Sequence, residues 1–196
     1  MRNLFKVFVL GFFVAFLFTS CGKQPTQEIS QAEAAVNDAI KEGADVYAKE
    51  ELKKLQDDLA AAMEEVNTQG KKVFKKYGNA KKMLLQVKTD AEALKATIPA
   101  KKEEAKNDAL KALDEAKVAV EEAKALLAKA PKGKGTKADI EAFTADLKGL
   151  EDMLTEVQQG IDTEDYFGAT DKAKIIKEKA ISISDQIKAA IEKVKR

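Results

Sequence analysis

The 196-residue sequence has no histidine, no tryptophan and one cysteine, Cys21. It therefore lacks the ligands of a Cys/His zinc site, the histidine of a catalytic triad and the partner for an internal disulfide. Its 34 lysines and arginines nearly balance 33 aspartates and glutamates, and the net charge of +1 gives no electrostatic reason to expect nucleic acid as a partner. We expect a protein that is not an enzyme and that has no nucleic-acid partner, no metal and no dissociable cofactor.

Aromatic residues are scarce beyond the first 20 positions, which hold six of the nine phenylalanines. The remaining aromatic residues are Tyr47, Phe74, Tyr77, Phe143, Tyr166 and Phe167. An aromatic ligand pocket, or a surface on which bases stack, is therefore poorly supplied with side chains.

The first 20 residues differ in composition from the rest of the chain. Arg2 and Lys6 precede an apolar run over positions 7–18, and the small residues Thr19 and Ser20 follow it. This order is typical of an export signal. The run has 12 residues, whereas a spanning helix needs about 20. We predict a signal peptide over residues 1–20.

The segment Leu17-Phe18-Thr19-Ser20-Cys21 resembles the lipobox of bacterial lipoproteins. In that family the cysteine thiol receives diacylglycerol, the peptide bond before it is cut, and the new amino terminus is often acylated with a chain such as palmitate. The resemblance implies that Cys21 is lipidated. Phe18 stands where the lipobox usually has leucine, with Leu17 one position further out. The alternative is an ordinary secretory signal with an incidental cysteine.

The residue after the cysteine bears on location. Aspartate there would suggest retention in the inner membrane of enteric bacteria, and this chain has Gly22. The resemblance therefore implies the outer membrane, and we expect a lipid-anchored protein that faces the periplasm rather than the cell surface. Two or three acyl chains hold a protein stably, since each buried CH₂ contributes about 0.8 kcal/mol.

Helical patterns follow the lipobox. Residues 22–28 are polar and contain Pro25, which is typical of a tether. Ser30 and Glu33 have the spacing of a capping box, and apolar residues at helical spacing predict one helix to about Asn67. Gly70 marks its expected end.

The next helix has the most regular apolar pattern. Steps of three and four residues, typical of a heptad seam, connect Tyr77, Ala80, Leu84, Val87, Ala91, Leu94 and Ile98. Pro99 is expected to stop or kink this helix, beyond which an alanine-rich seam continues to Ala130.

Proline and glycine then mark a break. Positions 131–135 hold one proline and two glycines, which predicts a loop over 131–138. The helix after it has a strongly apolar seam that includes Leu147, Leu150 and Leu154, and Thr163 is a candidate cap for the last helix. We predict a signal peptide (1–20), a lipidated tether (21–29), a helical hairpin with a long alanine-rich helix (30–130), a loop (131–138) and a second helical hairpin (139–196).

No strand pattern appears after the signal segment. The expected fold class is all-α, an elongated helical bundle or antiparallel coiled coil of four or five helices. Gln-Gly pairs at 69–70 and 159–160 each precede a tyrosine, Tyr77 or Tyr166, that begins a helical seam. This echo indicates two helix-turn-helix units, or a chance similarity between two heptad helices.

A second resemblance concerns the pattern Gly43-Ala44-x-x-Tyr47-Ala48-x-x-Glu51-Leu52, followed later by Tyr77 and Ala80. It is similar to a family of helical lipoproteins of Gram-negative bacteria whose domain has no known function. The resemblance implies a helical fold and an envelope location, and it supplies no catalytic residues. Many members carry proline after Tyr-Ala; Lys49 stands here, which predicts an uninterrupted helix.

Two charged features allow more than one interpretation. Lysine pairs at 71–72, 75–76 and 81–82 have few carboxylates near them in sequence, so they could contact anionic lipid or glycan, or form an ordinary solvated face. The C-terminus is similar in plan to that of murein lipoproteins, which attach to peptidoglycan through a terminal lysine. Arg196 occupies that position here, which argues against covalent attachment.

We expect a structural or scaffolding role in the envelope, with self-association or contact with another envelope protein. The candidate interaction seam comprises Leu84, Val87, Leu94, Leu147, Leu150 and Leu154. The alternative is a surface-exposed binding module, either an adhesin or a ligand receptor.

Overall fold

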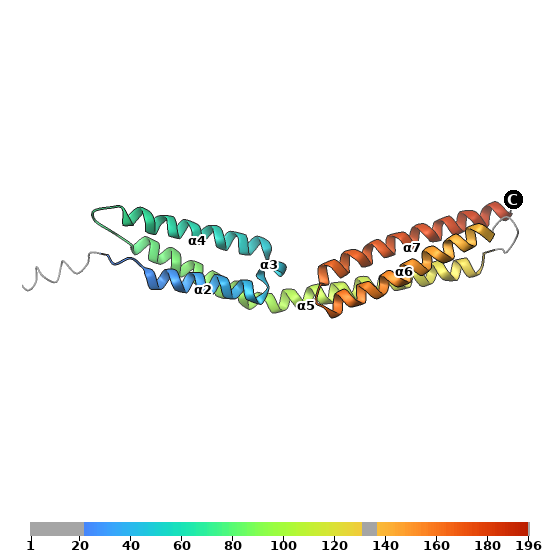
Figure 1. Cartoon of the computed structure of the whole chain (residues 1–196), viewed down its shortest axis with the longest axis horizontal. Coiled ribbons are helices and arrows are strands. Elements are labelled where there is room, and N and C mark those ends of the chain that lie inside the picture. Colours follow the sequence, from blue (N-terminus) through green and yellow to red (C-terminus); the bar gives the residue numbers. More distant parts are fainter. Residues whose placement is uncertain (1–21, 131–136, 196) are drawn as a thin grey trace, which may run out of the picture. The chain divides into compact units, whose positions relative to one another are not determined.

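A computed structural model of the chain describes residues 22–130 and 137–195 (Figure 1). The helices in this part of the chain are α2 (Thr26–Glu42), α3 (Ala44–Tyr47), α4 (Lys49–Gly70), α5 (Gly78–Ala128), α6 (Lys137–Asp162) and α7 (Tyr166–Lys195). Within those two ranges there is no strand, which confirms the all-α prediction. The expected signal peptide, Cys21 and most of the expected loop lie outside the described residues.

The chain divides into two compact units, unit 1 (Met1–Lys101) and unit 2 (Lys102–Arg196). The boundary lies inside α5, whereas we expected hairpins over 30–130 and 139–196. The difference arises because α5 has 51 residues, enough for its first half to pack with α2 and α4 and its second half with α6 and α7.

The interior of unit 1 is built on alanine and a few larger side chains. Ala32, Ala39, Ala44, Ala62, Ala80 and Ala91 have no exposed surface. Small residues let helix backbones approach closely, and Leu84, Val66 and Ile98 fill the space between the helices. Each member of the predicted seam from Tyr77 to Ile98 is buried, except Leu94, which is half-buried.

A sharp corner separates α2 from α4, where we expected one continuous helix from Ser30 to about Asn67. Gly43 ends α2 with a φ of 109°, a left-handed conformation that favours glycine, and a Cβ there would lie 3.1 Å from Cδ2 of Tyr47. One helical turn, α3, follows, and Ala48 with a φ of −149° separates it from α4. The prediction that Lys49 leaves the helix uninterrupted is wrong, because Ala48 itself breaks it.

Other helix boundaries also differ from those expected. Helix α2 begins at Thr26, inside the expected tether, with buried Pro25 before it and Ser30 inside the helix. Pro99 does not stop α5; it lies on the exposed side, where water can reach the carbonyl group that its missing N–H leaves unpaired. Helix α6 begins at Lys137, within the expected loop.

The last helix is capped by a different residue from the one expected. The backbone N–H of Gly168 donates to Oδ1 of Asp165, 3.1 Å away, so Asp165 rather than Thr163 caps the start of α7. The hydroxyl of Thr163 instead donates to the carbonyl oxygen of Gln159 near the end of α6.

Unit 2 packs α6 and α7 against the second half of α5. Its buried residues combine leucine, valine and isoleucine with alanine; they include Leu113, Ala116, Val120, Leu147, Leu150, Val157, Ala173, Ile176, Ala180 and Ile187. The predicted seam of α6 is thus mainly an interior surface of the unit, with Leu154 half-buried at its edge.

Ion pairs join the helices at the surface of each unit. In unit 1, Nζ of Lys81 lies 2.7 Å from Oε1 of Glu28, and Lys101 pairs with Glu51. In unit 2, Nζ of Lys177 lies 2.8 Å from Oε2 of Glu115. The lysine partners hold the pKa values of Glu28, Glu51 and Glu115 below the ordinary value of 4.5, mainly by hydrogen bonding.

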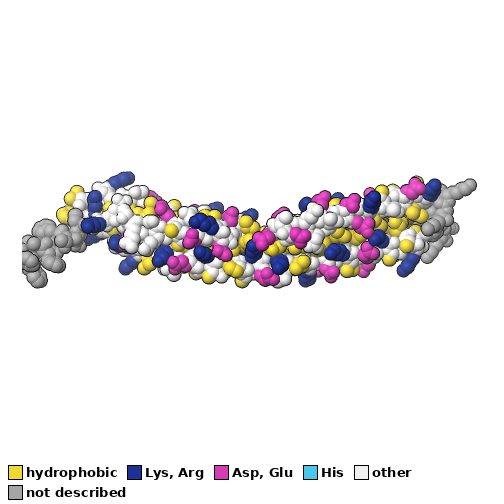
Figure 2. Space-filling model, turned by 60° about the horizontal axis from the view of Figure 1, so that its bottom comes forward, with side chains coloured by type: hydrophobic (Ala, Val, Ile, Leu, Met, Phe, Trp, Pro, Cys, Tyr) yellow, Lys and Arg dark blue, Asp and Glu magenta, His cyan; other side chains and the backbone are white. Residues whose placement is uncertain are grey.

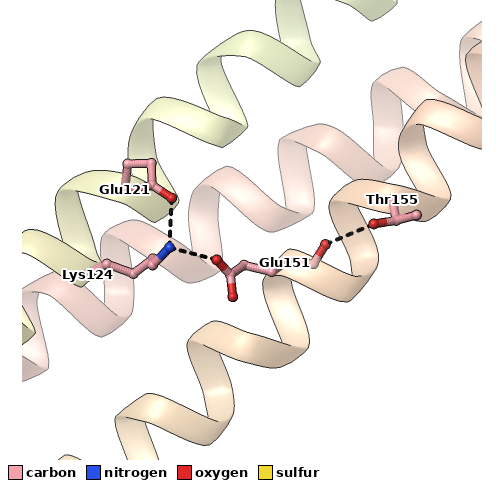
Figure 3. A network of polar contacts seen from close by, with 4 residues as sticks. All are labelled: Glu121, Lys124, Glu151 and Thr155. Carbon is pink, nitrogen blue, oxygen red and sulfur yellow. Dashed lines mark hydrogen bonds and ion pairs between the residues drawn. The ribbon is translucent and has the colours of Figure 1, made fainter.

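Lys124 is the centre of a small polar network between α5 and α6 (Figure 3). Its Nζ lies 2.9 Å from Oε1 of Glu121 and 2.7 Å from Oε1 of Glu151. Hydrogen bonds from the ammonium group raise the pKa of Lys124; the bond to Glu151 has the largest effect, and the bond to Glu121 comes next. The hydroxyl of Thr155 donates to the carbonyl oxygen of Glu151, 3.4 Å away. Exposed pairs of this kind add little free energy.

Two adjacent leucines in α5 test the core. Leu84 has 0% of its surface exposed and Leu85 has 60%. Leu84→Asp removes core packing and buries a carboxylate, so we expect it to lower the free energy of unfolding by about 3 kcal/mol or more. Leu85→Asp should change it by no more than about 0.5 kcal/mol. Urea denaturation followed by circular dichroism measures both, and equal effects would contradict the assignment of this helix face.

The pair between Lys177 and Glu115 predicts a pH dependence. A carboxyl group whose pKa is lowered in the folded state stabilises the protein above about pH 4.5, and this contribution is lost as the pH falls through the folded pKa. Lys177→Gln should therefore lower Tm at neutral pH and make no difference in strong acid. Lys174→Gln, which removes an exposed lysine one turn earlier on α7, is the control for the charge change. A Tm difference for Lys177→Gln that persists unchanged in acid would show that the pair is not its cause.

Candidate functional site

The first described residues lie against the turn between α4 and α5, at one end of unit 1 (Figure 1). We call this turn, residues 71–76, the lysine turn. A Cβ on Gly22 would lie 2.9 Å from the carbonyl oxygen of Lys75 and 3.1 Å from Cδ2 of Tyr77. The first is too close for any side chain unless the backbone shifts. Gly22 is therefore seated on the turn, and Pro25 is buried three residues later.

Gln69, in the last turn of α4, fixes the two ends of the lysine turn. Its carbonyl oxygen accepts a hydrogen bond from the N–H of Lys72 at 3.1 Å, and its Oε1 accepts one from the N–H of Lys76 at 3.3 Å. Its Nε2 donates to Oε1 of Glu65 at 2.9 Å. Gln69 and Tyr77 are both buried, so the backbone of the turn is held while the side chains between them face solvent.

The exposed side chains of the lysine turn combine an apolar centre with basic flanks. Val73 is 85% exposed and Phe74 81%, more than any other large hydrophobic residue in the described chain. On either side stand Lys71, Lys72, Lys75 and Lys76, which are also exposed. Figure 2 shows hydrophobic and lysine side chains together at the end of unit 1 where the described chain begins.

No carboxylate of the described residues lies within ion-pair distance of these four lysines. By contrast, Lys81, in the first turns of α5, is paired with Glu28. The lysine turn therefore carries positive charge that its own unit does not neutralise.

The turn between α6 and α7 closes the same kind of helix pair with opposite chemistry. Residues 162–165 are Asp-Thr-Glu-Asp, three carboxylates and no apolar side chain. Glu164 adopts a φ of 65°, and its carboxylate lies 2.6 Å from Nζ of Lys102. A turn between two helices of this protein thus needs neither exposed apolar residues nor lysines.

Two of the surface grooves in the described chain are further candidate sites. A groove of about 470 Å³ between α5 and α7 is lined by Asp108, Lys111, Glu115, Lys174, Lys177 and Glu178. A groove of about 350 Å³ between α4 and α5 is lined in part by Glu51, Asp58, Asp90 and Lys101. In each groove one lysine and one glutamate of the lining pair with one another, Lys177 with Glu115 in the first and Lys101 with Glu51 in the second.

Neither a metal site nor a membrane-spanning helix is found in the part of the chain that the structure describes. None of its groups of histidine, cysteine, aspartate and glutamate is placed to hold a metal ion. None of its helices is both long and apolar enough to cross a bilayer.

The structure places the residues of the candidate interaction seam mainly inside the units. Leu84, Val87, Leu147 and Leu150 are buried, while Leu94 and Leu154 are half-buried. A partner that contacted the buried four would have to displace a helix of the same unit. Sequence reasoning noted the lysine pairs but did not single out the exposed apolar pair between them. The sequence pattern that could have identified this pair is Val73-Phe74 between two lysine pairs, directly after the Gln-Gly pair at 69–70 that ends a helix.

The hydrogen bonds of Gln69 generate a prediction. Gln69→Ala leaves the N–H of Lys76 without its partner, which should cost about 1 kcal/mol and speed hydrogen exchange at that amide. Gln86→Ala is the matched control, because the amide of Gln86 bonds Asp90 on the exposed surface of one helix. Unchanged exchange at Lys76 in Gln69→Ala would show that Gln69 does not hold the turn.

No curated protein and no solved structure matches this chain significantly. A family model matches residues 27–110, a segment that includes the corner at Gly43, the lysine turn and the first part of α5. This confirms the expectation of a helical domain without a known function, while lipidation stays a prediction. Residues 27–110 match the family described as Domain of unknown function (DUF4398).

Proposed function

We propose that this chain is a lipid-anchored, non-enzymatic protein of the bacterial envelope with a structural or scaffolding role. The observation that carries the proposal is the contact of Gly22 with the lysine turn. Cys21 is bonded to Gly22, and consecutive Cα atoms lie only about 3.8 Å apart. A lipid on Cys21 would therefore hold this end of unit 1 at the membrane surface.

The anchor is supported by the sequence around Cys21, where small residues and the cysteine follow a short apolar run. Diacylglycerol and an N-terminal acyl chain are the only covalent groups that the proposal requires. Gly22 after the cysteine favours the outer membrane, and we place the folded part on the periplasmic side.

The scaffolding role is supported by the placement of the apolar side chains inside the units and by the length of the helices. The apolar seams fill the interior of each unit, and each of the two grooves carries a lysine–glutamate ion pair. At about 1.5 Å per residue, the 22 residues of α4 extend about 33 Å and the 30 residues of α7 about 45 Å. Such helices offer long surfaces to a second copy or to another envelope protein.

Lipidation is tested with Cys21→Ser in the producing cell. The unsubstituted protein should incorporate labelled palmitate and sediment with the outer membrane, whereas Cys21→Ser should incorporate none and should sediment with the membrane less completely. Thr19→Ser, a conservative change two residues before the cysteine, is the control and should behave as the unsubstituted chain. Membrane association of Cys21→Ser equal to that of the unsubstituted chain would contradict the anchor.

The side of the membrane is tested by protease treatment of intact and lysed cells. A periplasmic scaffold should be cleaved only after lysis, whereas a surface-exposed adhesin or receptor would be lost from intact cells. Amine-reactive crosslinking, for which exposed lysines provide targets, should then link the protein to itself or to an envelope protein. Links only to amino groups of peptidoglycan would instead indicate peptidoglycan as the partner.

A further inference from the structure

We propose that the lysine turn is a second membrane contact, which inserts Val73 and Phe74 into the interface of an anionic phospholipid leaflet and places its lysines on the headgroup phosphates. Its position at the membrane rests on the proposed lipid anchor. The binding chemistry of the turn is its own and can be measured without the anchor.

The apolar pair is the first argument. The other large hydrophobic residues that are mainly exposed in the described chain have between 41% and 60% of their surface exposed, against 85% for Val73 and 81% for Phe74. A valine and a phenylalanine beside lysines match the water-to-lipid interface, where apolar groups enter the acyl boundary and cations remain at the headgroups.

Charge is the second argument. Lys71, Lys72, Lys75 and Lys76 have no carboxylate partner among the described residues, and Lys23 is exposed in the segment that begins at Gly22. After Glu65, the next carboxylate in the sequence is that of Asp90. Several unneutralised lysines close to a bilayer are attracted to anionic headgroups.

The position and the ordered backbone of the lysine turn also favour a membrane contact. The turn lies against Gly22, and its backbone is bonded to Gln69 at both ends. Because the backbone is already ordered, little conformational entropy is lost on binding. The anchor and the turn would therefore reach the same leaflet together.

The acidic turn between α6 and α7 supplies the contrast. It joins two helices with Asp162, Thr163, Glu164 and Asp165, which would be repelled by an anionic surface. The apolar and basic side chains of the lysine turn are therefore not a requirement of closing a helical hairpin in this protein.

Insertion is measured with tryptophan, since the chain has none of its own. Phe74→Trp is made in the mature chain, residues 21–196, both lipidated and with Cys21→Ser. On vesicles rich in phosphatidylglycerol, its emission should shift to the blue and be quenched by brominated lipid. Thr163→Trp in the acidic turn is the control and should show neither change. Emission from Phe74→Trp that stays at its value in water, in both forms of the chain, would overturn the proposal.

The lysines are tested in the Cys21→Ser chain. A lysine near an anionic surface contributes about fivefold to partitioning, so replacing the four lysines of the turn with glutamine should weaken vesicle binding by roughly several hundredfold. The control variant carries Lys53→Gln, Lys54→Gln, Lys129→Gln and Lys148→Gln, which remove the same charge at other exposed positions. Equal binding to phosphatidylcholine and phosphatidylglycerol vesicles, or equal weakening by the control set, would overturn the proposed headgroup contact.

These experiments separate the two proposals. If the protein is not lipidated in cells but Phe74→Trp inserts into anionic vesicles as the Cys21→Ser chain, the anchor fails and the turn stands. If palmitate is incorporated but the tryptophan stays in water in both forms, the anchor stands and the turn fails. If the turn instead binds an envelope protein or peptidoglycan and leaves anionic vesicles unbound, the lipid contact is overturned.

Discussion

Close contact between helix backbones through alanine is the constraint on which both units depend. Alanines without exposed surface occur in every long helix except α6, and Leu84, Ile98, Ile176 and Ile187 fill the gaps between them. A buried alanine removes little apolar area from water, so many such contacts must be made in register. Long helices supply them, and pairs such as Lys81 with Glu28 favour one register at the surface.

Much of the fold could be predicted from the sequence because the apolar spacing is regular. The steps of three and four from Tyr77 to Ile98 identify the face of α5 that the structure buries. The corner at Gly43 was missed because Ala44 and Ala48 continue the buried pattern, and only the left-handed backbone of Gly43 shows where the helix ends. The division of α5 between two units could not be predicted, since a seam shows that a residue is buried but not which helix covers it.

The candidate site was only partly predictable. The lysine pairs and the lipobox-like segment are visible as residue patterns, whereas the exposure of Phe74 depends on where α4 ends and how the chain returns into α5. In another position the same Val-Phe pair would belong in a core. The seating of Gly22 on Lys75 joins residues 53 positions apart, and no local pattern indicates such a contact.

Because the first described residues are packed against unit 1, they cannot act as a flexible linker that lets the unit move away from an anchor at Cys21. A free linker lets a domain explore a volume whose radius grows as about 5–6 Å times the square root of its residue number. Of the described residues, only 22–25 precede α2; Gly22 is fixed against Lys75 and Pro25 is buried. With a lipid on Cys21, unit 1 would stay close to the bilayer surface, because no flexible linker would separate the lipid from the folded chain. Lateral diffusion of the lipid, rather than motion of a linker, would then set how often unit 1 meets its partners.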